Sequence, residues 1–220
     1  MKEKVAEKNN VYTFILEKAP DVNWKAGQHG IFEISHKKIK KATRPFSVAS
    51  TPREGKIQIS MQITDTPSDF KQAMYELEPG MTMNMRGPIG PMYFNAQEKN
   101  NLIIAGGLGI TPFRAMLKDL QLSKSDIKCT LLYMDSTGAF LYKSELDNIV
   151  ENSEDIEVQY LQQRDLLFEE ITQYTTKQGN DSQYFIAGSK KMVQSISDLL
   201  KTNNIKKSKI KKDSFRGYKG

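Results

Sequence analysis

Cysteine is nearly absent from this chain of 220 residues, because Cys129 is the only one. A single cysteine excludes an intramolecular disulfide, and it excludes an iron–sulfur cluster or a zinc ribbon held by four cysteines of the chain. Histidine is almost as scarce, and His29 and His36 lie apart from any cluster of Cys, Asp or Glu. We therefore expect no metal site. Cys129 falls within a strand-like pattern and is interpreted as a core residue.

Long apolar runs are also missing. No segment approaches the roughly 18–20 apolar residues of a membrane span, and the charged first residues lack the apolar centre of a signal peptide. Hydrophobic residues make up 38% of the chain and charged residues 26%, which is typical of a folded protein and not of a disordered one. We expect a cytoplasmic location without a transmembrane segment, which leaves room for a peripheral partner at a membrane.

The net charge of +6 is concentrated near the C-terminus. Residues 201–220 carry a net charge of +7, so the rest of the chain sums to −1. A second basic cluster contains Lys37, Lys38, Lys40 and Lys41. No RNA-binding aromatic pattern, helix-turn-helix or zinc finger accompanies these lysines, so nucleic acid is not expected. They are interpreted either as solvated surface residues or as a docking patch for an acidic redox partner or an anionic cofactor.

Two different patterns divide the chain. Residues 1–97 show short alternating segments at 11–16, 30–35 and 56–63, with one helix expected at 68–77 and Ser68 near its start. This pattern predicts a small closed antiparallel β-barrel. Residues 98–220 alternate strands at 101–105, 128–133, 156–160 and 183–187 with helices at about 112–122, 142–150, 166–174 and 190–202. Such alternation predicts a doubly wound parallel α/β sheet, and thus a two-domain α+β protein.

Two strand-to-helix turns in the second domain are candidates for binding phosphate. The first runs from Ala105 to Pro112, where Gly106, Gly107 and Gly109 permit a tight turn and close approach of a ligand. Thr111 is expected to cap the following helix, whose N-terminus favours anions. The second turn holds Gly188 and Ser189 before another helix. Each turn is also compatible with a purely structural role.

A third candidate site lies in the first domain, at Arg44-Pro45-Phe46-Ser47. An arginine, an aromatic ring and a hydroxyl within four residues suit a flavin: Arg44 would pair with a pyrophosphate, Phe46 would lie against the ring system and Ser47 would hydrogen-bond its reactive edge. Arg44 and Phe46 share one face in a regular strand, which complicates this division. The structural alternative is an exposed arginine beside a core phenylalanine.

In combination, these motifs resemble the ferredoxin–NADP reductase superfamily of FAD-dependent oxidoreductases over nearly the whole chain. Five motifs stand in the family's order: Arg44-Pro45-Phe46-Ser47, Gly87-Pro88-Ile89-Gly90, the stretch 105–112, Leu141-Tyr142-Lys143 with Glu145-Leu146, and residues 187–192. The resemblance implies that NAD(P)H gives a hydride to FAD, which passes electrons to an external acceptor such as ferredoxin or flavodoxin.

The resemblance also assigns roles to residues. Phe46 and Ser47 would contact the reactive ring of the flavin. The FAD contacts would come from Arg44, Pro45, Phe46, Ser47 and Ser68, and the nicotinamide nucleotide would lie along Gly106, Gly107, Gly109, Thr111 and Gly188. Tyr218 could cover the flavin, as a terminal tyrosine does in some ferredoxin reductases, or belong to a frayed end.

Departures from the family pattern keep two other functions open. Phe46 replaces a usual tyrosine, Leu108 a usual threonine and Ala187 a common cysteine. Phe46 and Ala187 also resemble bacterial NAD(P)H:flavin reductases, which release reduced free flavin. Leu108 and Ala187 suggest, as a further alternative, an electron-transfer subunit without NAD(P)H turnover.

The choice between NADH and NADPH stays open in the sequence. Asp135, after the second strand of the α/β domain, would accept a ribose hydroxyl, whereas Ser136 and Thr137 would favour a 2′-phosphate. Tyr142 would either stack on adenine or belong to the core.

Overall fold

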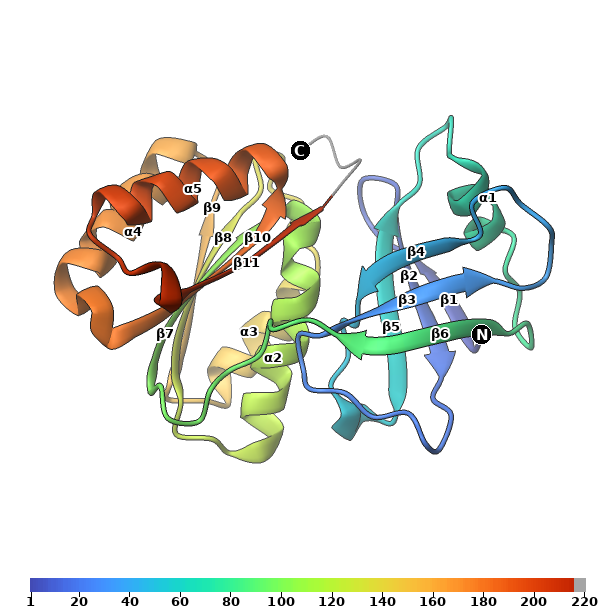
Figure 1. Ribbon diagram of the computed structural model, residues 1–220, viewed down its shortest axis with the longest axis horizontal. Coiled ribbons are helices and arrows are strands. Elements are labelled where there is room, and N and C mark those ends of the chain that lie inside the picture. Colours follow the sequence, from blue (N-terminus) through green and yellow to red (C-terminus); the bar gives the residue numbers. More distant parts are fainter. Residues whose placement is uncertain (216–220) are drawn as a thin grey trace.

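The N-terminal unit consists of two small antiparallel sheets. The computed structural model describes residues 1–215 (Figure 1). One sheet has the order β1-β2-β5 and the other β4-β3-β6. Their bounds are β1 (Glu3–Ala6), β2 (Val11–Glu17), β3 (His29–Ile34), β4 (Thr43–Ser47), β5 (Lys56–Gln62) and β6 (Met83–Ile89). A 3₁₀ turn η1 (Pro52–Glu54) and the helix α1 (Asp69–Tyr75) complete the unit.

Strand alternation builds the core of this unit. Ile57, Ile59 and Met61 on β5 are buried, as their spacing predicts, and they pack with Phe14, Phe32 and Phe70. The Ser68 hydroxyl accepts a hydrogen bond from the backbone N–H of Lys71, so Ser68 is the N-cap of α1. The expected antiparallel β-domain is therefore present, with its backbone ladders divided between two three-stranded sheets.

The C-terminal unit is a five-stranded, entirely parallel sheet in the order β11-β10-β7-β8-β9. Its strands are β7 (Asn100–Gly106), β8 (Lys128–Met134), β9 (Ile156–Leu161), β10 (Ser182–Ser189) and β11 (Ile210–Phe215). The helices are α2 (Ile110–Ser123), α3 (Lys143–Glu151), α4 (Arg164–Gln178) and α5 (Lys190–Thr202). The doubly wound fold predicted from alternating strands and helices is confirmed.

The two faces of this sheet bury different helices. On β7, Ile103 and Ala105 face the core of α2 and α3, whereas Leu102 and Ile104 face α4 and α5. The face with α2 and α3 lies toward the N-terminal unit, which Figure 1 shows on the other side of these helices. The strand order reverses between β7 and β10, and the carboxyl ends of strands beside such a reversal are where ligands bind in this fold.

Strand β11 was not expected, because its sequence looked like a solvated lysine tail. Lys209 is paired with Glu98 at 2.8 Å. Lys211 donates a hydrogen bond to the carbonyl oxygen of Tyr93 at 2.7 Å. The interpretation of this segment as a free basic tail is therefore wrong for Lys209 and Lys211, which attach the last strand to the polypeptide between β6 and β7. Lys206, Lys207 and Lys212 are exposed.

A buried ion cluster joins the two units. Arg114, on α2, is 3% exposed and contacts Glu54 of the N-terminal unit and Glu145 of α3. Its guanidinium also donates to the carbonyl oxygen of Ala49 at 3.0 Å. Burial alone would raise the pKa of Glu54, but the hydrogen bonds and charge of Arg114 hold it below its ordinary value. The interface is therefore organised around one arginine that both units surround.

In residues 1–215, the helices all fall short of the length and apolarity that a membrane crossing demands.

Candidate functional site

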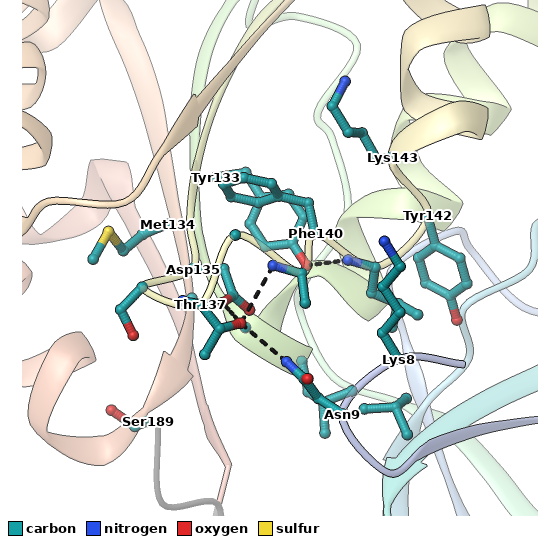
Figure 2. Close-up of a pocket in the computed structure, with 18 of the residues that line it drawn as sticks. Lys8, Asn9, Tyr133, Met134, Asp135, Thr137, Phe140, Tyr142, Lys143 and Ser189 are labelled. Carbon is teal, nitrogen blue, oxygen red and sulfur yellow. Dashed lines mark hydrogen bonds between the residues drawn. The ribbon is translucent and has the colours of Figure 1, made fainter. Parts of the chain in front are cut away.

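A cavity of about 780 Å³ lies where β7, β8 and β10 end and the N-terminal unit approaches. Its floor contains Gly106, Gly107 and Leu108, and its walls include the loop after β8 and the start of α5. The turn between β1 and β2 lines the opposite side with Lys8 and Asn9 (Figure 2). This volume falls in the usual range for small-molecule and cofactor sites. The cavity therefore fits a nucleotide at the place the fold predicts.

The glycines of the first turn serve two different purposes. Gly107 adopts a φ of 51° and lines the cavity with Gly106. A Cβ on Gly109 would lie 2.1 Å from the carbonyl oxygen of Ala187, and one on Gly106 would lie 2.1 Å from the Met192 sulfur. These two positions therefore need glycine for packing against β10 and α5, whatever the ligand. Gly188 is also close-packed, because a Cβ there would lie 3.1 Å from the same sulfur.

Two helices begin beside the cavity. The Ser189 hydroxyl accepts a hydrogen bond from the N–H of Met192 at 3.3 Å, which makes Ser189 the N-cap of α5. Thr111 does not cap α2: the helix begins at Ile110, and the buried Thr111 hydroxyl donates to the Leu108 carbonyl oxygen at 3.0 Å. The capping expectation for Thr111 is therefore wrong, and its hydroxyl instead ties the helix to the loop before it.

Aromatic side chains shape the loop after β8. The Phe140 ring packs edge-on against Tyr133, with ring centroids 5.1 Å apart, and contacts Tyr160 at 4.9 Å. The Tyr142 hydroxyl is hydrogen-bonded to Ser60 of the N-terminal unit at 2.5 Å. The same ring lies 5.9 Å from the Arg114 guanidinium, and burial raises the pKa of its hydroxyl. Tyr142 is thus engaged at the domain interface, which answers the alternative between adenine stacking and the core.

The segment Arg44 to Ser47 forms β4, at the edge of its sheet. Arg44 and Phe46 do share one face, since the Arg44 guanidinium lies 5.6 Å from the Phe70 ring centre and Phe46 stacks on that ring at 5.8 Å. The Arg44 guanidinium donates to the Thr43 carbonyl oxygen at 2.7 Å. Within residues 1–215 it has no carboxylate partner, so its charge is available to an anion.

Ser47 and Pro45 complete this segment. Ser47 is 7% exposed, and its hydroxyl makes no hydrogen bond to the described part of the chain. Pro45 is exposed and lies opposite Ile31 of β3. A free guanidinium, an aromatic face and a free hydroxyl within one strand fit the phosphate, ring and polar edge of a flavin. The assignment of these residues, and of Ser68, to a flavin stays a prediction.

Asp213 is a candidate residue that the sequence analysis missed. Strand β11 places it beside Ala187 of β10. Burial raises the pKa of the Asp213 carboxyl, and the charge of His29 acts in the opposite direction. His29 in turn lies opposite Ser47 in the β3–β4 ladder. An acid of the C-terminal unit therefore lies close to the flavin-like segment of the N-terminal unit. Tyr218 lies outside the described residues.

The raised pKa of Asp213 predicts a pH-dependent cost. The folded protein binds this proton more tightly than the unfolded chain, so stability falls as pH rises through the folded-state pKa. Asp213→Asn is expected to raise the melting temperature by about 2–4 °C at pH 8, corresponding to about 1 kcal/mol. The gain should shrink as the pH is lowered toward 4. Asp21→Asn, at an exposed position, is the control. A gain that does not change with pH would contradict this account.

Two protein-family models match the chain. Residues 1–94 match an oxidoreductase FAD-binding domain, and residues 103–198 match an oxidoreductase NAD-binding domain. Among curated proteins, the plasma membrane-associated coenzyme Q6 reductase PGA3 of Saccharomyces cerevisiae is 35% identical over 88 residues, which is 39% of this chain and 28% of that protein. The NADH-cytochrome b5 reductase 2 of Mycosarcoma maydis is 30% identical over 90 residues, or 40% and 26%. A component of the Na(+)-translocating NADH-quinone reductase of Idiomarina loihiensis is 27% identical over 139 residues, or 58% and 34%. The match thus spans about a third or less of each relative.

Solved structures share the arrangement of both units. Ferredoxin-NADP+ reductase from Plasmodium falciparum superimposes with a TM-score of 0.81 at 18% identity, covering 97% of this chain and 94% of that one. The Amycolatopsis cytochrome P450 reductase GcoB also gives 0.81, at 15% identity, with coverage of 97% and 68%. At these identities the likeness establishes the fold.

Proposed function

Because the chain belongs to the ferredoxin–NADP reductase superfamily, with an FAD-binding and an NAD-binding domain, we propose that it is an NAD(P)H oxidoreductase that passes electrons to an external acceptor such as ferredoxin or flavodoxin. The observation that carries the proposal is the position of the cavity. It opens at the carboxyl ends of β7, β8 and β10 and is closed on its other side by the N-terminal unit. A nucleotide held there lies between the two domains.

The chain's own residues would hold both cofactors. FAD, when bound, accepts a hydride and supplies electrons one or two at a time. Arg44 would bind the FAD pyrophosphate with Ser68 as a second contact, Phe46 would lie against the ring and Ser47 would hydrogen-bond its polar edge. Gly106, Gly107 and Ser189 would surround the nicotinamide nucleotide, while Gly109, Gly188 and Thr111 keep the loops in place.

Charge near β4 supports an acidic acceptor. Lys37 is paired with Glu76, whereas Lys38, Lys40 and Lys41 are exposed on the connection that leads into β4. These three lysines stand on the same segment as Arg44, at the edge of the flavin-like site. Complementary charge accelerates association between redox partners. A small acidic protein docked there would lie close to the flavin.

The test is an anaerobic absorption spectrum of the purified protein before and after NADH or NADPH. We expect flavin bands that bleach with one of the two nucleotides and return when oxidised flavodoxin or ferredoxin is added. Bound flavin that neither nucleotide bleaches would overturn NAD(P)H turnover. Bleaching without reoxidation by either protein would overturn the proposed acceptor class.

A second function, NAD(P)H:flavin oxidoreduction, is favoured by one contact. Phe46 stacks on Phe70 and meets Phe32 edge-on at 6.1 Å, so part of its ring is engaged inside the domain. It also lacks the hydroxyl with which a tyrosine could bind the cofactor. A colourless preparation that reduces added riboflavin or FMN with saturable kinetics would select this function over the first.

A further inference from the structure

We propose that Asn9 of the flavin domain positions the Asp135 carboxylate of the nucleotide domain, and that this carboxylate makes the cavity selective for NADH over NADPH. The inference rests on the proposed function, since it concerns which nucleotide the cavity takes. It joins two domains through one chain of hydrogen bonds, from Asn9 to Thr137 to Asp135 (Figure 2). None of the three residues touches the flavin-like segment of β4.

Asp135 stands where a dinucleotide's adenosine ribose is read. It directly follows β8, whose last residue, Met134, is level with Gly106 of the glycine turn. An acid at the end of this strand accepts hydrogen bonds from ribose hydroxyls. The Asp135 Oδ1 atom accepts from the N–H of Thr137 at 2.9 Å and from its hydroxyl at 2.6 Å. No hydrogen bond within residues 1–215 uses Oδ2, which is left for a ribose.

The Thr137 hydroxyl has no capacity left for a 2′-phosphate. Its one proton is donated to Asp135, and its oxygen accepts from Asn9 Nδ2 at 3.0 Å and from the N–H of Ala139 at 3.3 Å. A hydroxyl has one donor and two acceptor sites, so all three are occupied. Thr137 therefore cannot donate to a phosphate without breaking this network. The Asp135 charge would also repel that phosphate.

Asn9 reaches the network from a firmly held turn. Asn9 and Asn10, between β1 and β2, both have a φ of 56°, a conformation that asparagine tolerates better than most residues. The Gln62 side chain on β5 donates to the Asn9 carbonyl oxygen at 3.3 Å. The turn is thus attached to its own sheet while the Asn9 amide crosses to the other domain. Loss of this amide would free the Thr137 hydroxyl to rotate and would loosen Asp135.

The cations around the cavity act on both nucleotides alike. Lys143 is paired with Asp147 at 2.7 Å, and the Arg164 guanidinium lies 5.0 Å from the Phe168 ring centre. Lys8 and Lys191 are exposed at the cavity wall. These groups attract the pyrophosphate that NADH and NADPH share. The discrimination therefore depends on what faces the ribose.

The experiment measures nucleotide preference in the flavin-loaded protein. Calorimetric titration with NAD⁺ and NADP⁺ gives binding directly, and initial rates with NADH and NADPH give kcat and KM. We expect the wild type to prefer the NAD form at least tenfold. Asp135→Asn should reduce this ratio at least fivefold. Asn9→Ala should raise KM for NADH about threefold to tenfold, leave kcat unchanged and lower the preference ratio.

Asn10→Ala is the matched control, because Asn10 shares the turn and the φ of Asn9 but has no side-chain hydrogen bond within the described residues. It should leave the preference ratio unchanged. Tighter binding of NADP⁺ by the wild type would overturn the selectivity. An unchanged ratio in Asn9→Ala would overturn the positioning role. Binding and turnover of neither nucleotide would instead contradict the proposed function itself.

Discussion

Replacing Arg114 by leucine is expected to lower the free energy of unfolding by about 3–5 kcal/mol, the loss typical when one member of a buried ion cluster is removed. The Arg114 guanidinium is almost fully buried and receives two carboxylates. Without it, Glu54 is left partly buried with its main counter-charge gone, although Lys56 stays 3.8 Å away. The Ala49 carbonyl oxygen loses its donor as well.

The loss should appear as a fall in melting temperature of roughly 6–20 °C, since 1 kcal/mol corresponds to about 2–4 °C in a chain of this size. Arg53→Ala is the control, because the Arg53–Asp119 pair is largely exposed and such pairs contribute about 1 kcal/mol or less. The triple variant Arg114→Met, Glu54→Gln, Glu145→Gln should regain much of the loss, because it leaves no unpaired charge. A fall below about 3 °C for Arg114→Leu would show that the cluster does not hold the domains together.

Arg44→Ala is expected to yield protein without bound flavin. If the guanidinium binds the FAD pyrophosphate through two charge-assisted hydrogen bonds, each contributing about 1.5–3 kcal/mol, the dissociation constant should rise by roughly 100-fold or more. Arg44 makes no ion pair within residues 1–215, so its removal leaves no carboxylate exposed or buried without a partner. The fold should therefore survive the change.

The measurement is the ratio of flavin to protein absorbance after purification, followed by titration of the flavin-free protein with FAD. Arg44→Lys should recover only part of the affinity, because a lysine offers a point charge and no planar fork. Arg86→Ala is the matched control: Arg86 is exposed on β6, at the opposite edge of the same sheet. Full flavin content in Arg44→Ala would place the pyrophosphate elsewhere.

Local patterns determined most of the fold. The 3.6-residue period over 190–202 predicted helix α5 with the bounds that the structure has, and Ser189 caps it as expected. Alternation over 56–63 predicted which side chains of β5 enter the core. The order of strands and helices predicted a parallel sheet, because short crossovers permit few other arrangements. The glycine-rich turn after β7 was found for the same reason: tight turns need particular residues at particular positions.

Tertiary structure alone decided the contacts that connect distant segments. Nothing in the spacing of residues 206–212 distinguishes a lysine that is paired with Glu98 from one that is solvated, so β11 was missed. Asn9 and Thr137 are 128 positions apart, and only the approach of the two domains brings them within 3.0 Å. The same approach surrounds Arg114 with carboxylates and resolves the role of Tyr142. A sequence records periodicity and turn chemistry locally, whereas partners across an interface depend on how two finished surfaces meet.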